Sequence, residues 1–200
     1  CTTKVMQNYL KIDHPCAGTL RQKNCYNSND IIDTKLFNKV GVECEIAIRL
    51  AEDIFYSKTH KLEDLYPSIE SVFPAIEIVD DRYSNWKNFT VNHLIADDFF
   101  SAGCVLGNNK FEGNIQDVGK LEGSMFINNI KVGAGIGNHI LGNPFNALKW
   151  LSSRKDIIGD FIPKNSIILL GSLVETYWVV KGDEVRIKIE GMDSVHINFH

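Results

Sequence analysis

The chain of 200 residues contains 44% hydrophobic and 23% charged residues and has a formal net charge of -4 at pH 7. Such a chain can bury a full core, and we expect residues 1–200 to form one domain. The charges are spread without a basic block or aromatic–basic interleaving, which argues against nucleic acid as a partner. No apolar run approaches the ~20 residues of a membrane-spanning helix, so no membrane segment is expected.

The five cysteines are odd in number and show no Cys-x-x-Cys spacing, so they predict neither a disulfide framework nor a zinc site. No signal peptide is visible, and a reducing cytoplasm is therefore the expected location. The six histidines show no ligand spacing. We expect His93 and His139 to be surface or packing residues.

The first 35 residues show little periodicity and several turn formers, which indicates a short helix around Lys4–Leu10 followed by loop. The β-branched and aliphatic residues of 40–50 then predict a strand that is buried on at least one face. Side chains alternate along a strand, so Glu43 and Glu45 point to the same side and Cys44 points to the other.

Two neighbouring carboxylates in an apolar strand repel each other and resist desolvation, so something must compensate for them. A hard divalent cation such as Mg²⁺ or Mn²⁺ prefers carboxylate oxygens and would do so. Glu77 interrupts a second apolar run, 74–80, and is the third candidate ligand. The alternative interpretation is that the pair lies on the solvated face of an amphipathic sheet, with Arg49 as a surface partner.

Apolar residues at spacings of three and four predict a helix over 61–72, which Pro74 ends before the strand that carries Glu77. Residues 86–100 read as mixed helix or loop, and recurring glycines over 104–137 predict short antiparallel strands. Asn143 and Pro144 open a helix. Residues 166–172 predict a buried strand, and alternation near the C-terminus predicts two closing strands. The expected fold class is α+β with β dominant.

Several motifs, taken in this order, resemble those of one family. They are the glutamate pair in 42–46, the segment 74–82 followed by Trp86, the segment 141–151, Gly171-Ser172-Leu173 and Lys181-Gly182-Asp183. Together they resemble the 2-keto-4-pentenoate hydratase and 2-oxo-3-hexenedioate decarboxylase family, within the fumarylacetoacetate hydrolase superfamily.

The resemblance implies a mixed β-roll of the fumarylacetoacetate hydrolase C-terminal-domain type, with Mg²⁺ or Mn²⁺ held by Glu43, Glu45 and Glu77. It implies a metal-dependent lyase of aromatic compound catabolism that hydrates 2-hydroxypenta-2,4-dienoate-like acids and assembles as a homo-oligomer. The alternative is a 2-oxo-3-hexenedioate-type decarboxylase. Both reactions use a stabilised dienolate, so the three glutamates do not separate them. Ser172 would contact the substrate carboxylate, or else only satisfy the turn that ends its strand.

Two departures from the family concern proton transfer. Residues 2–7 resemble the stretch after the family's Gly-x-Lys-x-Gly segment, so the catalytic lysine is expected before residue 1, and the family's N-terminal helical segment is expected to be missing. Cys16 occupies the place of an Asp that transfers protons, and a thiol replaces it poorly near neutral pH. The catalytic residues are therefore unassigned, and a third hypothesis is a catalytically impaired protein that binds metal or small acids or serves as an assembly partner.

Overall fold

The computed structural model describes residues 1–108 and 110–200. Its α-helices and 3-10 segments (η) are α1 Lys4–Leu10, η1 Gln22–Asn24, η2 Thr34–Leu36, α2 Leu62–Leu65, η3 Tyr66–Ser68, η4 Trp86–Asn88, α3 Val91–Ala96, η5 Asp98–Phe100, η6 Ile115–Lys120, η7 Gly137–His139, α4 Phe145–Ser152 and α5 Lys155–Ile158. Its strands are β1 Cys25–Asn27, β2 Ile31–Ile32, β3 Val40–Leu50, β4 Ile54–Phe55, β5 Ile69–Asp80, β6 Ser101–Leu106, β7 Glu122–Ile127, β8 Ile130–Ile136, β9 Phe161–Ile162, β10 Ile167–Ser172, β11 Tyr177–Trp178, β12 Glu184–Ile189 and β13 Val195–Phe199.

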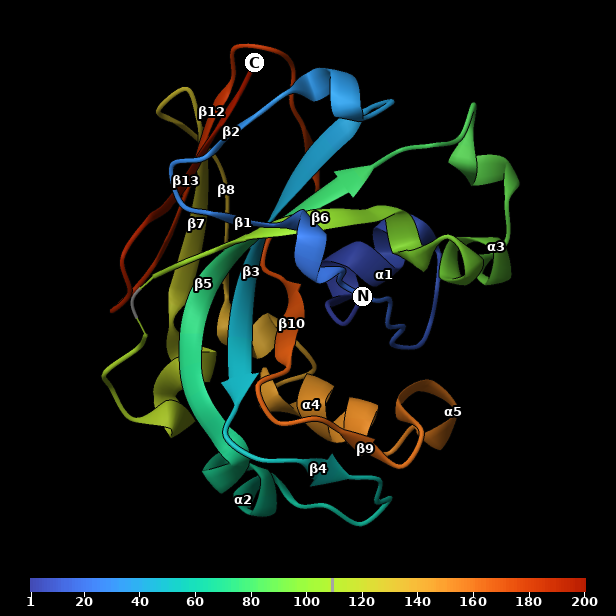
Figure 1. Ribbon diagram of the computed structural model, residues 1–200, viewed down its shortest axis with the longest axis vertical. Coiled ribbons are helices and arrows are strands. Elements are labelled where there is room, and N and C mark those ends of the chain that lie inside the picture. Colours follow the sequence, from blue (N-terminus) through green and yellow to red (C-terminus); the bar gives the residue numbers. More distant parts are fainter. Residues whose placement is uncertain (109) are drawn as a thin grey trace.

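Two mixed β-sheets form the body of the molecule. The larger sheet has the strand order β1-β6-β5-β3-β10, with β11 also paired to β3, and the smaller one has the order β2-β13-β12-β7-β8. Strand β1 runs parallel to β6, and β2 runs parallel to β13, whereas the other pairs are antiparallel. In Figure 1 the smaller sheet lies to the left of β3 and β5, and helices α1, α3, α4 and α5 lie on the opposite side.

The main core lies between the two sheets. On β3 one set of alternate side chains, which includes Val42, Cys44 and Ile46, is fully buried there. The smaller sheet contributes buried residues such as Val185 and Ile187. Because side chains alternate, Glu43 and Glu45 point to the other face of the larger sheet, which the helices cover.

The predicted helix over 61–72 is wrong. Helix α2 is a single turn followed by η3, and β5 begins at Ile69 and runs through Pro74. The carbonyl of Pro74 points away from β3 and accepts from the Gly107 amide (2.9 Å), which lies just beyond the end of β6. This direction explains why β5 tolerates a proline. In an antiparallel strand the N–H of a residue points to the same side as its C=O, so the missing N–H removes no bond to β3.

The other predicted elements are confirmed. The helix over 4–10 is present, and the Oδ1 of Asn143 accepts from the Phe145 amide (2.9 Å) at the start of α4. Strand β10, the β7–β8 hairpin and the closing strands β12 and β13 lie where the pattern placed them. No helix in the described part of the chain is long and apolar enough to cross a membrane.

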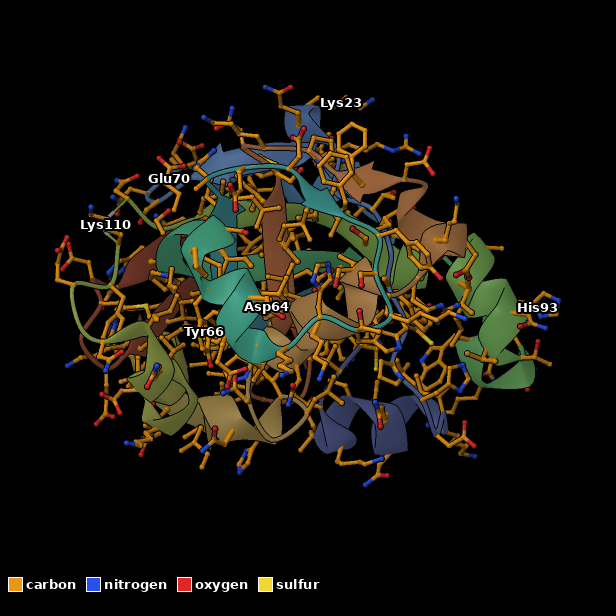
Figure 2. The ribbon with its side chains drawn as sticks, turned by 90° about the horizontal axis from the view of Figure 1, so that it is seen from below. Lys23, Asp64, Tyr66, Glu70, His93 and Lys110 are labelled. Carbon is orange, nitrogen blue, oxygen red and sulfur yellow. The ribbon has the colours of Figure 1, made fainter. Side chains whose placement is uncertain are left out.

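The predictions for His93 and His139 are also confirmed, since both side chains are exposed. Figure 2 shows His93 at the edge of the molecule on α3, pointing away from the body, with Lys23, Glu70 and Lys110 also on the outside. The Nδ1 of His93 lies 2.9 Å from the Thr90 hydroxyl at the start of that helix. These histidines belong to the surface and not to an active site.

Candidate metal centre and its cavity

The three glutamates singled out in the sequence lie together. Glu43 on β3 is the direct cross-strand partner of Glu77 on β5, and Glu45 lies two residues further along β3 on the same face. One carboxylate oxygen from each of the three lies within 4.8 Å of those of the other two. They therefore can share one ion, and the interpretation that they are a solvated surface pair is not supported.

Burial makes the cluster electrostatically unfavourable without a cation. Glu43 and Glu45 are 6% and 2% exposed, and Glu77 is half-buried. Burial and the charges of Glu77 and Glu43 raise the pKa of Glu45 well above its usual range. Burial and the Glu43 charge raise the pKa of Glu77 to about 8. Burial also raises the pKa of Glu43, partly offset by the hydrogen bond from the Thr176 hydroxyl.

Hydrogen bonds hold two of the carboxylates in place. The Gly171 amide donates to Oε2 of Glu45 at 2.7 Å, and the Thr176 hydroxyl donates to Oε1 of Glu43. Gly171 adopts φ +146°, a backbone conformation that favours glycine, and so directs its amide toward Glu45. Sequence reasoning missed Thr176 and the role of the Gly171 amide, because only the pairing of β10 and β11 with β3 brings them to the carboxylates.

The residues present fit a divalent cation. No Lys, Arg or His within 1–108 and 110–200 forms an ion pair with any of the three carboxylates, so no basic side chain there neutralises them directly. Three convergent carboxylates form a hard, all-oxygen donor set of the kind that Mg²⁺ and Mn²⁺ prefer. A bound cation would relieve both the mutual repulsion and the desolvation of these side chains.

The carboxylates form part of the wall of a cavity of about 210 Å³ on the helix-covered face of the larger sheet. The cavity is lined by α1, the segment 16–20, η5, α4, β10 and the end of β5, with Trp86 and Trp178. Most of these lining side chains are apolar, so the acidic cluster opens into a confined and largely apolar space.

Cys16 lies in the wall of the same cavity. It is 5% exposed, and its thiol points to the carbonyl of His14 at 3.8 Å. Burial raises the pKa of this thiol, so it is protonated near neutral pH.

Ser172 is a buried cavity residue whose hydroxyl donates to the Val174 carbonyl at 2.8 Å. It is the cross-strand partner of Glu45. In this arrangement the hydroxyl satisfies its own turn while it lies beside the acidic cluster.

Comparison with known proteins agrees with the family resemblance that the order of motifs indicates. The profile of the fumarylacetoacetate (FAA) hydrolase C-terminal family matches residues 13–198. The chain belongs to this fumarylacetoacetate hydrolase family. Its fold is the mixed, β-dominant α+β fold expected from the resemblance.

Within the fumarylacetoacetate hydrolase family, the chain is 28% identical to a 2-keto-4-pentenoate hydratase of Paraburkholderia xenovorans over 199 residues, which covers 99% of this chain and 73% of the relative. It is 30% identical to the TodF product hydratase of Pseudomonas putida over 200 residues, covering 99% of this chain and 73% of the relative. The expected relationship to 2-keto-4-pentenoate hydratases is confirmed.

The fold also matches a solved structure. The structure of 4-oxalocrotonate decarboxylase from Pseudomonas putida G7, complexed with magnesium and adipate, superimposes with a TM-score of 0.90 at 24% identity. The match covers 100% of this chain and 75% of that chain. Hydratases and a decarboxylase are thus both similar to this protein.

Proposed function

We propose that this protein is a metal-dependent hydro-lyase that adds water to 2-hydroxypenta-2,4-dienoate-like acids, with residues 1–200 acting as a single catalytic-type domain. The observation that carries the proposal is the convergence of Glu43, Glu45 and Glu77 in the wall of a confined apolar cavity. Similarity to a 2-keto-4-pentenoate hydratase supports hydration as the reaction.

Glu43, Glu45 and Glu77 would hold the cation, for which Mg²⁺ or Mn²⁺ is proposed; a solved relative is complexed with magnesium. When bound, the cation supplies the positive charge that stabilises an enolate oxygen of a 2-oxo or 2-hydroxy acid. Thr176 and the Gly171 amide orient two of the carboxylates, which fixes the directions of their remaining lone pairs.

The cavity contributes confinement and a low dielectric. Its apolar lining limits competing water, and this strengthens every charge interaction at the acidic end. Ser172 is the proposed contact for the substrate carboxylate. The Ser172 hydroxyl donates its proton to the Val174 carbonyl, so it would have to turn away from that carbonyl to donate to a ligand.

The test is ultraviolet loss of the dienoate absorbance on addition of the protein with Mg²⁺, compared with the protein treated with a chelator. We expect turnover that requires the cation and is lost in Glu45→Gln, while Glu70→Gln, an exposed glutamate on β5, retains it. No turnover of any dienoate in the series by well-folded, metal-loaded protein would contradict the proposal.

A second candidate function is a catalytically impaired protein that binds metal or small acids. The observation that favours it is the buried, protonated thiol of Cys16 in the cavity wall, at the position where the family resemblance expects a carboxylate. A decarboxylase acting on a 2-oxo-3-hexenedioate-type acid is the alternative within the same chemistry, and similarity to 4-oxalocrotonate decarboxylase supports it.

A further inference from the structure

Aromatic side chains gather at the side of the cavity next to the acidic cluster. Six aromatic residues line the cavity, and all except Trp150, which belongs to α4, are here called the aromatic wall: Tyr9, Trp86, Phe99, Phe100 and Trp178. From this wall we infer that the cavity selects monocarboxylic 2-oxo or 2-hydroxy acids with an alkyl or aryl tail and rejects dicarboxylic ones. The inference rests on the proposed function, since it names the substrate class of the same site.

The aromatic wall begins directly beside the carboxylates. Val79 lies two residues beyond Glu77 on the same face of β5, about 7 Å along the strand. It packs in one apolar cluster with Trp86 and Phe100. A ligand whose acid end lies at the glutamates therefore meets apolar surface within a few carbon atoms.

Gly41 makes room for this side of the cavity. It pairs with Val79 across β3 and β5 and with Trp178 across β3 and β11. A Cβ at this position would lie 2.9 Å from the Trp178 ring and 3.0 Å from Val79. The absent side chain thus lets the indole lie over the strand next to Glu43.

Three rings of the aromatic wall pack on one another. The Tyr9 and Trp86 centroids lie 5.3 Å apart, and those of Trp86 and Phe100 lie 6.0 Å apart with nearly perpendicular planes. Phe99 and Phe100 both have positive φ, +51° and +65°, which is unfavourable for bulky residues. A strained backbone of this kind persists where the surroundings enforce it, and here it places two rings at the cavity.

The charge of the lining completes the argument. Among the described side chains that line the cavity there is no Lys, Arg or His, and the charged side chains are the three glutamates and Asp98. The ammonium group of Cys1, which also lines the cavity, donates to the Cys16 carbonyl at 2.8 Å. A second carboxylate on a ligand would lose its hydration there without a basic side chain to replace it.

Two basic side chains that contact tryptophans of the cavity lining are already engaged. Lys39 lies over the Trp178 ring, with its Nζ 4.5 Å from the centroid. Arg154 stacks on Trp150 at 5.0 Å and is ion-paired with Asp156 at 2.6 Å. Of the two reactions that the family resemblance leaves open, the lining therefore favours hydration of a monocarboxylate over decarboxylation of a hexenedioate.

The test is calorimetric binding of stable saturated 2-oxo acids to the full chain in Mg²⁺: 2-oxopentanoate, 2-oxohexanoate, 2-oxo-4-phenylbutanoate and the dicarboxylate 2-oxohexanedioate. We expect affinity to rise about fourfold for each added methylene and 2-oxohexanedioate to bind at least ~100-fold more weakly than 2-oxohexanoate. Equal or tighter binding of the dicarboxylate overturns the inference, as does failure of every acid to bind.

A positive charge introduced into the aromatic wall gives a second test. Phe99 is only partly buried, so the Phe99→Arg variant should fold. It should reduce the ratio of the 2-oxohexanoate affinity to the 2-oxohexanedioate affinity at least tenfold. The Phe99→Leu variant should leave this ratio unchanged. If instead the wild type binds the dicarboxylate tightly and Arg154→Met abolishes this, Arg154 is the counter-charge and the inference is wrong.

The two proposals fail separately. If no dienoate is turned over while the order of binding holds, the hydratase proposal is wrong and the inferred ligand class stands. If dienoates with and without a second carboxylate are hydrated with equal kcat/KM, the hydratase proposal stands and the inferred selectivity is wrong.

Discussion

Glu43 and Glu77 lie directly opposite each other on adjacent antiparallel strands, β3 and β5. Like charges at such positions destabilise a sheet, and burial adds to this effect. The protein therefore keeps these two carboxylates opposite each other at a cost in folding stability. The geometry supports the binding of a cation that both share with Glu45, and the predictions below follow from that relationship.

Neutralising Glu77 should raise the stability of the metal-free protein and lower its affinity for Mg²⁺. We expect Glu77→Gln to raise the metal-free free energy of unfolding at pH 8 by about 1 kcal/mol or more, because a buried charge and a repulsion are removed. In Mg²⁺ at 100 times its Kd the wild type should gain about 2.7 kcal/mol, and the variant should gain almost nothing. Thermal or urea unfolding with and without Mg²⁺ measures both effects. Glu70→Gln, at an exposed position of β5, is the matched control and should behave as the wild type.

Metal-free stability should fall as the pH rises. The pKa of Glu77 is about 8 in the folded protein, above the ordinary value of 4.5, so the folded state binds more protons than the unfolded state between these values. Stability is then highest below about pH 4.5, as far as this group is concerned, and is lost as the pH rises toward 8. Each unit of the shift corresponds to about 1.4 kcal/mol of unfolding free energy. Calorimetry from pH 5 to 8 tests this, and a loss that Mg²⁺ does not reverse at pH 8 would contradict the assignment.

The hydroxyl of Thr176 should matter more than its methyl group. Thr176→Val keeps the shape but removes the hydrogen bond to Glu43, so Mg²⁺ affinity should drop about tenfold, as for other residues that orient a metal ligand. Thr176→Ser retains the donor and should restore affinity to near the wild-type value. Isothermal titration with Mg²⁺ measures the two variants side by side. Equal affinity in Val and Ser variants would mean that Thr176 does not orient Glu43.

A side chain at Gly41 should disturb the Trp178 side of the cavity. Gly41→Ala places a Cβ against Trp178 and Thr176, and we expect a loss of about 1–3 kcal/mol from overpacking. Trp178→Leu in the same chain should recover part of that loss, since the two positions are in contact. Urea unfolding of the two single variants and the double variant gives the coupling. Strictly additive losses would show that Trp178 is not what Gly41 accommodates.

Cys16 decides between an active and an impaired enzyme. If the family's proton-transferring carboxylate belongs at this position, Cys16→Asp should raise kcat by at least tenfold over the present chain. Cys16→Asn has a similar size but cannot exchange a proton and should give no gain. The assay is dienoate turnover with Mg²⁺ at several pH values, and a gain in the Asp variant should follow a carboxyl titration. Turnover by wild type that exceeds both variants would show that the thiol side chain is suited to this site.

The sequence by itself determined that Glu43 and Glu45 share one side of β3, the alternation of the closing strands and the order of motifs that marks the family. These depend on side-chain periodicity and local residue types, which act within a few residues. Only the tertiary structure decided that Glu77 faces Glu43, that β5 starts at Ile69 and not after Pro74, and that Thr176 reaches a carboxylate. The aromatic wall was likewise decided by the tertiary structure, since its five members come from four separate places in the chain. Strand register and the packing of distant segments depend on contacts between residues far apart in sequence, and no local pattern encodes them.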